Sequence, residues 1–427
     1  MKISIIGTGY VGLVTGVVLA GKGHEVICVD VDKEKIDRIN QAVPPIHEDG
    51  LPEMLKAVVN NKKLRATTDL KEAIQNSEIC FICVGTPSKP DGSIDLTQLE
   101  NAVKQVGTAL KEKKGFLSIV VKSTVVPGTT ENVVLPAIIH ASGKKAPEHF
   151  SLCYNPEFLR EGKAMQDTLK PDKLVIGHTD TICSNNLKQV VTPICPVIET
   201  NYKTAELIKY ANNAFLATKI SFANEIGNLC KQLGIDAYTV SRAIGFDPRI
   251  GNQFLGAGLG FGGSCLPKDT AALTSAYKKH GLEPKLLKAV TEINDNQTER
   301  FVHLAEKKVG HLSGKQIAVL GTAFKAGTDD TRESPSIKVI GLLLTKGAKV
   351  RVFDPKALEN TKRELGNKVE YVNSIADCLK DADLCLICTD WPEFKFIDFA
   401  GMKNKVVIDG RHIVEKKDGI TYEGLSW

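Results

Sequence analysis

Short apolar runs alternate with helix-spaced stretches along the first part of the chain. Helical spacing covers Val11–Lys22 and Lys33–Gln41, and the segment after residue 41 reads as irregular. The runs are rich in β-branched residues, as in strands buried on both faces: ISIIG (3–7), HEVICVD (24–30), EICFICVGTP (78–87) and SIVVKSTV (118–125). This order predicts a doubly wound parallel sheet with right-handed crossovers.

The same order of elements returns in the last part of the chain. The corresponding segments are QIAVLGTAFK (316–325), AKVRVFDP (348–355), SIADCLKDADLCLICTDWP (374–392) and KVVIDGR (405–411). We therefore predict an α/β fold with two doubly wound Rossmann-like domains of similar topology.

The middle of the chain has few strand signals. Apolar residues follow helical spacing from about residue 202 to Gly234, which is a plausible C-cap. We expect a long central helix to join the two Rossmann-like domains within a helical middle domain. The predicted domains are residues 1–200, 201–300 and 301–427, and the middle one is expected to form a homodimer or a higher homo-oligomer.

Composition narrows the class of protein. The 427 residues are 42% hydrophobic and 25% charged, which is ordinary for a globular protein. The net charge is +5, and the sequence has no concentrated basic patch of the kind that binds nucleic acid. No apolar run reaches the roughly 18 residues of a membrane span. The apolar run at the N-terminus is too short for a signal peptide and leads into a glycine motif. We expect a cytoplasmic protein.

The 11 cysteines, an odd number scattered along the chain, indicate reduced thiols rather than a disulfide framework. Two pairs have CxxC spacing, Cys80/Cys83 and Cys385/Cys388, and both lie in apolar runs. Residues three apart on a strand point to opposite faces, so neither pair is expected to chelate a metal. We interpret them as small apolar core residues and predict no metal site.

The segment from Gly7 to Gly12 matches GxGxxG. The pattern is weak alone, but here it follows a strand, opens a helix and precedes a second strand that ends at Asp30. The motif predicts that Gly7, Gly9, Tyr10, Val11 and Gly12 hold a dinucleotide pyrophosphate at the helix N-terminus. Asp30 would accept hydrogen bonds from the ribose hydroxyls and so favours NAD over NADP. Lys35, one turn further on, weakens that preference slightly.

Two threonines follow predicted strands of the first sheet. Thr86 and Thr124 stand at carboxyl ends of strands, where open α/β sheets bind ligands, so both are expected to contact cofactor or substrate. The corresponding turn of the second half, GTAFKAG, lacks the third glycine at the right spacing. That half is expected to bind a nucleotide-like group in another way.

Four further segments are dense in polar groups. They contain Glu157 with Glu161 in NPEFLREG, which would form an i,i+4 pair on a helix; Lys209 with Asn213 on the long helix; Cys265 with Asp269 in GFGGSCLPKDT; and Lys325 with Arg332 in FKAGTDDTRESPS. Each has an ordinary interpretation as solvated surface. The cysteine alone fits a buried filler, a metal ligand, a redox sensor or a nucleophile.

Together these segments resemble the UDP-glucose 6-dehydrogenase family, of which GDP-mannose 6-dehydrogenase is a close relative. The resemblance covers residues 1 to about 411. It implies oxidation of a sugar C6 alcohol to a carboxylic acid by two hydride transfers to NAD. DPRIGNQFLGAGLGFGGS looks more like the UDP-glucose members, so UDP-glucose is the preferred substrate and GDP-mannose the alternative.

The resemblance also assigns roles to the polar residues. Cys265 would be the nucleophile that forms a thiohemiacetal and then a thioester. The glycines before it would allow close approach of the substrate, and Lys209 with the nicotinamide cation would supply the positive surroundings that a thiolate needs. Lys209 would stabilise the developing oxyanion, Asn213 would orient the oxyanion or a water, and Asp269 would hold a catalytic water. Glu157 or Glu161 would activate the hydrolytic water, and the spacing does not decide which one. Thr124 is counted with the catalytic group.

Contacts carry over from the family in the same way. The cofactor contacts are Thr86, Thr124, Glu161, Lys268 and Arg332. The substrate contacts are Phe158, Leu159, Arg160, Glu161, Lys209, Asn213, Arg249, Phe254, Leu255, Gly262, Lys325 and Arg411. Arg249 would be supplied across a dimer interface. Gly256 stands where animal members often have a lysine, so one phosphate contact is expected to be missing.

Two other functions compete with this interpretation. One is a two-electron hydroxyacid dehydrogenase of similar architecture, with a catalytic lysine and a structural Cys265. The other is a non-catalytic NAD-binding or redox-sensing protein, which would not require Lys209, Asn213, Glu161 and Asp269 together.

Overall fold

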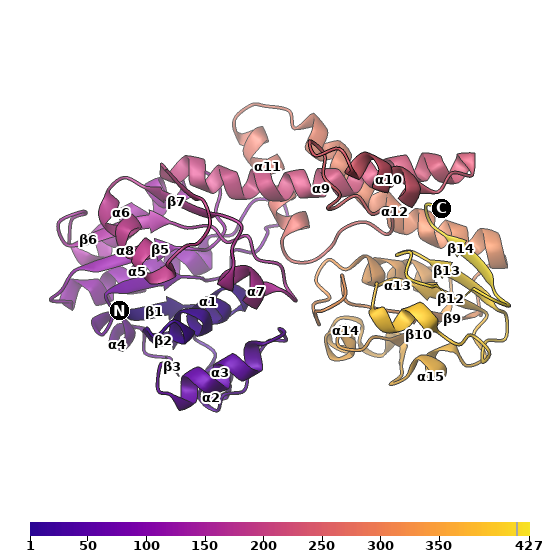
Figure 1. The fold of residues 1–427 in the computed structure, drawn as a ribbon, viewed down its shortest axis with the longest axis horizontal. Coiled ribbons are helices and arrows are strands. Elements are labelled where there is room, and N and C mark those ends of the chain that lie inside the picture. Colours follow the sequence, from indigo (N-terminus) through magenta and orange to yellow (C-terminus); the bar gives the residue numbers. More distant parts are fainter. Residues whose placement is uncertain (416) are drawn as a thin grey trace. The chain divides into compact units, whose positions relative to one another are not determined.

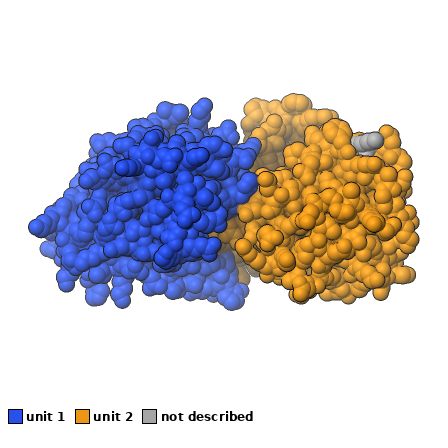
Figure 2. Space-filling view, turned by 90° about the horizontal axis from the view of Figure 1, so that it is seen from below, with its two compact units in different colours: residues 1–212 blue, residues 213–427 orange. Residues whose placement is uncertain are grey.

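A computed structural model describes residues 1–415 and 417–427 of the chain. They divide into two compact units, residues 1–212 and 213–427, which are coloured in Figure 2. Both units are α/β, as the sequence predicts (Figure 1). In these described residues no helix is long and apolar enough to cross a membrane.

The first unit is built on a sheet of eight strands in the order β3-β2-β1-β4-β5-β6-β7-β8. The strands are β1 (Lys2–Ile6), β2 (Glu25–Val29), β3 (Leu64–Thr67), β4 (Ile79–Ile82), β5 (Leu117–Val121), β6 (Phe150–Tyr154), β7 (Leu174–His178) and β8 (Val197–Thr200). The helices are α1 (Tyr10–Gly21), α2 (Lys33–Asn40), α3 (Leu51–Asn60), α4 (Leu70–Gln75), α5 (Thr97–Glu112), the π-helix η1 (Thr130–Val134), α6 (Leu135–Ser142), α7 (Ala164–Leu169) and α8 (Thr181–Val191).

The first sheet differs from the prediction in three ways. Its last three strands in the chain, β6, β7 and β8, were not predicted. The region after residue 41, expected to be irregular, forms α3 and the edge strand β3, which pairs parallel to β2. Strand β7 pairs antiparallel to β6, so the sheet is mixed rather than wholly parallel. β3 was missed because its four residues, LRAT, alternate in burial and carry the exposed Arg65, which breaks the apolar run.

In the described part of the second unit, six parallel strands follow the order β11-β10-β9-β12-β13-β14. They are β9 (Gln316–Leu320), β10 (Lys349–Phe353), β11 (Glu370–Tyr371), β12 (Leu384–Ile387), β13 (Val406–Asp409) and β14 (Thr421–Gly424). The helices are α10 (Ala237–Gly245), α11 (Leu266–Lys279), α12 (Lys285–Val309), α13 (Pro335–Thr345), α14 (Leu358–Leu365), η2 (Gly366–Lys368), α15 (Ile375–Leu379) and η3 (Pro392–Phe396).

The long predicted helix is present as α9, Tyr202–Leu233 (Figure 1). Its first residues are counted with the first unit and the rest with the second. Gly234 follows in the left-handed conformation with φ +67°, which confirms it as the point where the helix ends.

Each sheet separates two apolar clusters, one on each face. In the first unit, Cys83 packs into one cluster and Cys80 into the other. In the second unit, Cys388 and Cys385 divide in the same way. This confirms that members of each CxxC pair point to opposite faces of a strand. All 11 cysteines are free thiols.

Candidate active site

The glycine turn between β1 and α1 has the geometry of a dinucleotide site. Gly7 has φ +96°, in the region that favours glycine. A Cβ on Gly12 would lie 1.9 Å from the carbonyl oxygen of Gly7, so only glycine allows the helix to pack this closely on the turn. Gly9, the N-cap of α1, has no atom within 4 Å of a Cβ position, so the space beside the helix N-terminus is open. Tyr10 and Val11 begin the helix and are partly buried.

Asp30 follows β2 and points back to this turn. Its Oδ2 accepts hydrogen bonds from the Thr8 backbone N (2.9 Å) and Oγ1 (2.6 Å). Burial would raise the pKa of Asp30, but the hydrogen bonds from Thr8 and Asp32 and the charge of Lys35 outweigh it and lower the pKa. The carboxylate is therefore ionised and fixed at the place where a ribose diol would bind. These residues fit NAD as a bound group.

The two predicted threonines lie together at the carboxyl edge of the first sheet. The Thr86 hydroxyl donates to the Thr124 carbonyl oxygen at 2.8 Å. Strands β4 and β5 are neighbours and parallel, so the residues that follow them reach the same edge.

Residues 155–160 are not helical, so Glu157 and Glu161 do not form an i,i+4 pair on a helix. Asn155 and Pro156 extend the chain directly from β6, which prevents the helical turn that the pair would need. The Glu157 Oε1 instead pairs with the Lys209 ammonium at 2.8 Å, and its Oε2 accepts from the Leu159 backbone N at 2.8 Å.

The ion pair between Glu157 and Lys209 is buried, with side chains 7% and 3% exposed. Burial would raise the pKa of Glu157. The charge and hydrogen bond of Lys209, the Leu159 N–H and the charge of Lys122 outweigh it, and the pKa is lowered. Glu157 is thus a buried carboxylate that stays ionised.

The other residues of NPEFLREG have different surroundings. The Phe158 ring has the Lys173 ammonium 4.3 Å and the Lys209 ammonium 5.5 Å from its centroid. Arg160 is bidentate to Asp167, at 2.6 and 3.0 Å. Glu161 is buried.

A second group of polar side chains lies within residues 213–427. Asn213 Nδ2 donates to Asp269 Oδ2 at 2.7 Å, and the Lys268 ammonium contacts Asp269 Oδ1 at 2.6 Å. Asp269 is 1% exposed. Sequence positions 213 and 269, far apart in the chain, are therefore brought together by the fold.

Cys265 is the N-cap residue of α11 and is partly buried. Its Sγ lies 3.5 Å from Ser264 Oγ. Helix N-termini favour negative charge and so stabilise thiolates. Sequence reasoning sought this positive environment in Lys209 and the cofactor, although Pro267 at the start of a helical pattern was a signal for the helix N-terminus.

The glycines before Cys265 are required by packing inside the second unit. A Cβ on Gly262 would meet the Glu333 carbonyl oxygen at 2.3 Å, and one on Gly263 would meet the Phe324 ring at 2.7 Å. They were expected to admit substrate. The space beside Gly262 and Gly263 is filled by the chain's own residues.

Predicted contacts in the second unit are spread over several segments. Arg411 donates to the carbonyl oxygens of Cys388 (2.9 Å) and Gly260 (3.1 Å), and so holds the segment before Cys265. Arg332 forms a bidentate pair with Asp330. The Lys325 ammonium lies 5.6 Å from the Phe324 ring centroid.

The proposed substrate loop has a strained residue. Phe254 has φ +64°, which is unusual for a residue with a side chain, and such strain clusters at ligand sites. Leu255 beside it is buried, whereas Arg249 is 87% exposed in its side chain and pairs with Asp247.

The second Rossmann-like turn differs from the first in the hydrogen bonds of its aspartate. Asp354 follows β10 as Asp30 follows β2. Its Oδ2 accepts from the backbone N of Thr322 (2.7 Å) and Ala323 (3.0 Å) and from Trp391 Nε1 (3.1 Å). Its Oδ1 accepts from Lys356 N and Ala357 N. Both oxygens of the Asp354 carboxylate therefore already accept hydrogen bonds from groups of the second unit.

Sequence reasoning missed two buried or partly buried polar residues, Lys122 and Glu48. Lys122 donates to Asn155 Oδ1 at 2.9 Å. Glu48 accepts from the backbone N of Gly162 (2.8 Å) and Ala164 (2.5 Å) and so fixes the end of the NPEFLREG segment. The signal for Lys122 was its position directly after the apolar run of β5. Glu48 has no such signal in the sequence, because its partners are backbone groups remote in sequence.

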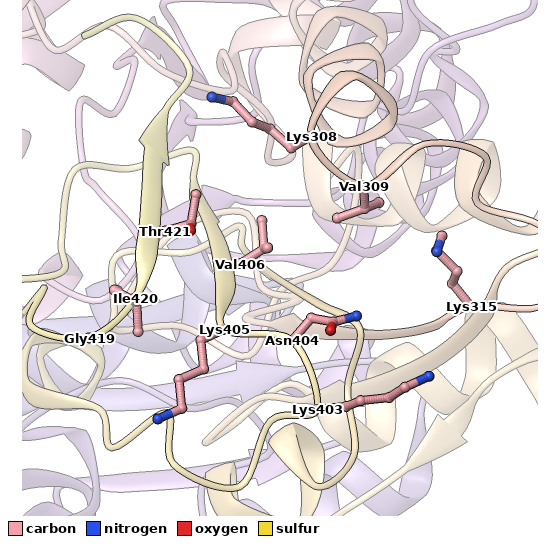
Figure 3. Close-up of a pocket in the computed structure, with 10 residues that line it drawn as sticks. All are labelled: Lys308, Val309, Lys315, Lys403, Asn404, Lys405, Val406, Gly419, Ile420 and Thr421. Carbon is pink, nitrogen blue, oxygen red and sulfur yellow. The ribbon is translucent and has the colours of Figure 1, made fainter.

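A pocket of about 630 Å³ opens elsewhere in the second unit, lined by Lys308, Lys315, Lys403 and Lys405 (Figure 3). It lies at the amino ends of β13 and β14, the edge opposite to the one where α/β sheets bind ligands. Figure 3 shows the four ammonium groups at separate corners of the pocket, not converging on one point. Across residues 1–415 and 417–427, no group of three or more His, Cys, Asp or Glu could hold a metal ion.

The glycine turn of the first unit and Asp30 beside it define a dinucleotide-binding protein. Three family models match the chain in order. They describe the NAD binding domain (residues 1–195), the central domain (203–296) and the UDP binding domain (318–416) of the UDP-glucose/GDP-mannose dehydrogenase family. The chain belongs to this family.

Individual relatives agree over the full length. The UDP-glucose 6-dehydrogenase AglM of Haloferax volcanii is 46% identical, with 100% of both chains covered. TuaD of Bacillus subtilis, also a UDP-glucose 6-dehydrogenase, is 43% identical over 96% of this chain and 89% of its own. A solved UDP-glucose dehydrogenase from Pyrobaculum islandicum is 43% identical, with a TM-score of 0.95 over 100% of this chain and 97% of its own.

The glycine turn generates a prediction that separates folding from cofactor binding. In Gly12→Ala the new Cβ would meet the Gly7 carbonyl oxygen, so we expect lower thermal stability and at least about 10-fold weaker NAD binding. In Gly9→Ala the new methyl enters open space, so stability should be unchanged while NAD binding weakens to a similar degree. Thermal unfolding and NAD titration by calorimetry measure the two effects.

Gly115→Ala is the matched control, because Gly115 also has open space at its Cβ position and lies away from the turn. It should change neither property. Unchanged NAD affinity in Gly9→Ala would show that the cofactor does not approach this helix N-terminus.

Proposed function

We propose that this protein oxidises the C6 alcohol of UDP-glucose to the carboxylate, with two molecules of NAD and one of water. The observation that carries this proposal is the full-length similarity to UDP-glucose 6-dehydrogenases, 46% identical over 100% of both chains in the first case. We retain the division into an NAD-binding domain (1–200), a central helical domain (201–300) and a nucleotide-sugar-binding domain (301–427).

The first step converts the alcohol into an aldehyde. NAD, when bound, accepts the hydride from C6, and the hydroxyl proton leaves to a base. The ion pair with Glu157 positions the buried Lys209 ammonium. This ammonium would stabilise the oxyanion that develops on the sugar. Asn213, four residues on along α9, would orient the same oxygen or a water through its amide.

The second oxidation requires the aldehyde to become a hydride donor. The Cys265 thiolate adds to the carbonyl carbon, and the oxyanion takes up a proton to give a thiohemiacetal. Loss of a hydride from that carbon to a second NAD, and of the hydroxyl proton to a base, leaves a thioester. The position of Cys265 at the N-terminus of α11 supports this role, because such ends favour a thiolate.

Hydrolysis then releases the acid. Water attacks the thioester carbon, the C–S bond breaks, and Cys265 is regenerated. Glu157 is our choice for the group that takes the proton from this water, because its lowered pKa keeps it ionised and able to accept one. Glu161, also buried, is assigned to cofactor and substrate contacts.

The remaining contacts stay predictions from the family resemblance. For cofactor they are Tyr10, Val11, Lys35, Thr86, Thr124, Lys268 and Arg332. For substrate they are Phe158, Leu159, Arg160, Arg249, Phe254, Leu255, Gly262, Lys325 and Arg411. The eleven free cysteines support a reducing compartment, and we propose the cytoplasm.

A GDP-mannose 6-dehydrogenase with the same mechanism is the alternative. A solved GDP-mannose dehydrogenase from Pseudomonas aeruginosa is 37% identical over 100% of both chains, with a TM-score of 0.59. The higher identity and TM-score of the UDP-glucose enzymes favour UDP-glucose.

We also propose that α9 mediates a homodimer. Phe215, Phe222 and Leu229 recur at heptad spacing on this helix and are 65%, 48% and 56% exposed. Phe246, just after α10, is 80% exposed. A stripe of large apolar side chains left in water is typical of an interface, and a second copy of this helix has the matching stripe.

The reaction predicts a stoichiometry of two NADH for each UDP-glucose consumed. We expect this ratio from absorbance at 340 nm with limiting sugar, and GDP-mannose should be turned over at least about 10-fold less efficiently. A ratio of one would indicate a two-electron dehydrogenase. Faster turnover of GDP-mannose would reassign the substrate.

When the proposed nucleophile Cys265 is replaced, we expect the reaction to stop between the first and the second oxidation. Cys265→Ala should make no acid at an appreciable rate, a loss of at least about 1,000-fold, because the aldehyde is no longer converted into a hydride donor. Cys265→Ser should accumulate a slowly hydrolysed ester or stop at the aldehyde. Mass spectrometry of quenched wild-type enzyme should find a substrate adduct on Cys265. The buried Cys230→Ala serves as the control and should keep both NADH transfers.

The proposed interface predicts a change of mass in solution. Phe215→Glu with Phe222→Glu should convert the dimer to monomer, because dimerisation would bury two carboxylates without partners. Light scattering after size exclusion measures the mass. Phe396→Glu, at a phenylalanine that is 68% exposed in η3, should leave the mass unchanged. A wild-type monomer would refute the proposal.

A further inference from the structure

Lys122 stands where β5 ends, at the edge of the sheet that carries Thr86 and Thr124. Its backbone N donates to the Ile82 carbonyl oxygen at 2.9 Å, which fixes its main chain to β4. Its ammonium donates to Asn155 Oδ1 at 2.9 Å. The side chain is only partly exposed. A lysine held in this way is not a solvated surface residue.

Asn155 is the residue through which Lys122 reaches the candidate active site. Its backbone N donates to the Val121 carbonyl oxygen at 2.8 Å, and its Nδ2 donates to the Val175 carbonyl oxygen at 2.9 Å. With Oδ1 on Lys122, both ends of the amide are engaged, and the residue is 1% exposed. Asn155 is separated from Glu157 only by Pro156, whose ring limits backbone freedom. The placement of Asn155 is therefore transmitted to Glu157.

The charges around Glu157 come from several elements. The Lys209 ammonium on α9 and the Lys122 ammonium after β5 both act on the carboxylate. Two thiols also face Lys122, Cys83 after β4 and Cys153 on β6. Burial raises the pKa of Cys83 to about 12, and burial raises the pKa of Cys153 as well, so both stay neutral. Two ammonium groups thus act on one buried carboxylate.

We infer that Lys122 is a positioning residue for Glu157. Through Asn155 it fixes the start of the segment that carries the carboxylate, and its charge helps to keep that carboxylate ionised. The inference rests on the proposed role of Glu157 as the group that accepts a proton from the hydrolytic water. An acceptor must be ionised at working pH, and burial alone would work against that.

The test is the pH profile of kcat for oxidation of UDP-glucose in Lys122→Met. The pKa of Glu157 is lowered in the wild type, so the acid limb should lie at low pH. Removing one of the two ammonium groups raises that pKa, and the limb should move to higher pH by roughly 1 unit. At neutral pH, kcat should also fall, by about 10-fold, because Asn155 loses its anchor. Lys122→Arg keeps the charge and a hydrogen-bond donor. In this variant the acid limb should lie close to its wild-type position, and most of the wild-type kcat should remain.

Lys113→Met is the matched control for loss of a buried lysine. Lys113 is 8% exposed, and its ammonium donates to the carbonyl oxygens of Ile74 (3.0 Å) and Gln75 (3.1 Å) at the end of α4. This variant should lose stability without moving the acid limb. If Lys122→Met behaves like Lys113→Met, with lower stability and an unmoved limb, Lys122 is only structural and the inference is wrong.

Glu157→Gln separates this inference from the proposed function. The acid limb should disappear in that variant. If it persists, Glu157 is not the ionisable group and the proposed role fails first. If it disappears but stays unmoved in Lys122→Met, the proposed role stands and the Lys122 inference fails. Should Lys122→Met not fold, Lys122→Gln removes the charge with a smaller change in polarity, and the same shift is expected.

Discussion

The buried ion pair between Lys209 and Glu157 is the interaction on which the candidate site depends. Two charges at 2.8 Å, each under a tenth exposed, lose most of their hydration, and a buried pair of this kind rarely adds stability over apolar residues. Its value lies in what it fixes. The pair holds the non-helical segment after β6 against the long helix, with the Glu157 carboxylate ionised and both side chains fixed in position before substrate binds. Preorganised charge of this kind is what transition-state stabilisation requires.

The two Rossmann-like units show how one topology gives two kinds of site. Asp30 and Asp354 occupy equivalent places after the second strand of each sheet. Asp30 keeps the geometry of a ribose acceptor beside an open helix N-terminus at Gly9. Asp354 accepts hydrogen bonds from five donors of its own unit, and Ala323 stands where the first turn has Gly9. Fold alone therefore does not determine the ligand, and the two carboxylates differ in the partners that each has.

Sequence predicted the elements whose signal is local. The strands around Ile5 and Val319, the helix ending at Gly234 and the dinucleotide turn all follow from periodicity and glycine placement. Strand β3 was missed because an edge strand lacks a continuous apolar run. Strands β6, β7 and β8 were also missed, and the reversed direction of β7 appears only in its pairing with β6. In the site, sequence indicated Asp269 and Asn213 but not that they contact each other. Glu48 was invisible, since its partners are backbone groups in a remote segment.

The glycines before Cys265 have a packing role that the sequence did not indicate. They were expected to make room for a sugar, yet a side chain at Gly262 or Gly263 would collide with the segment 324–335. Their physical effect is to let that segment pack directly against the start of α11, with Arg411 tying Gly260 to the end of the second sheet. The cysteine is thereby attached to a rigid sheet although it lies between a loop and a helix. As the proposed nucleophile, Cys265 would meet the same carbon through addition, oxidation and hydrolysis, and such attachment would limit its displacement in each step.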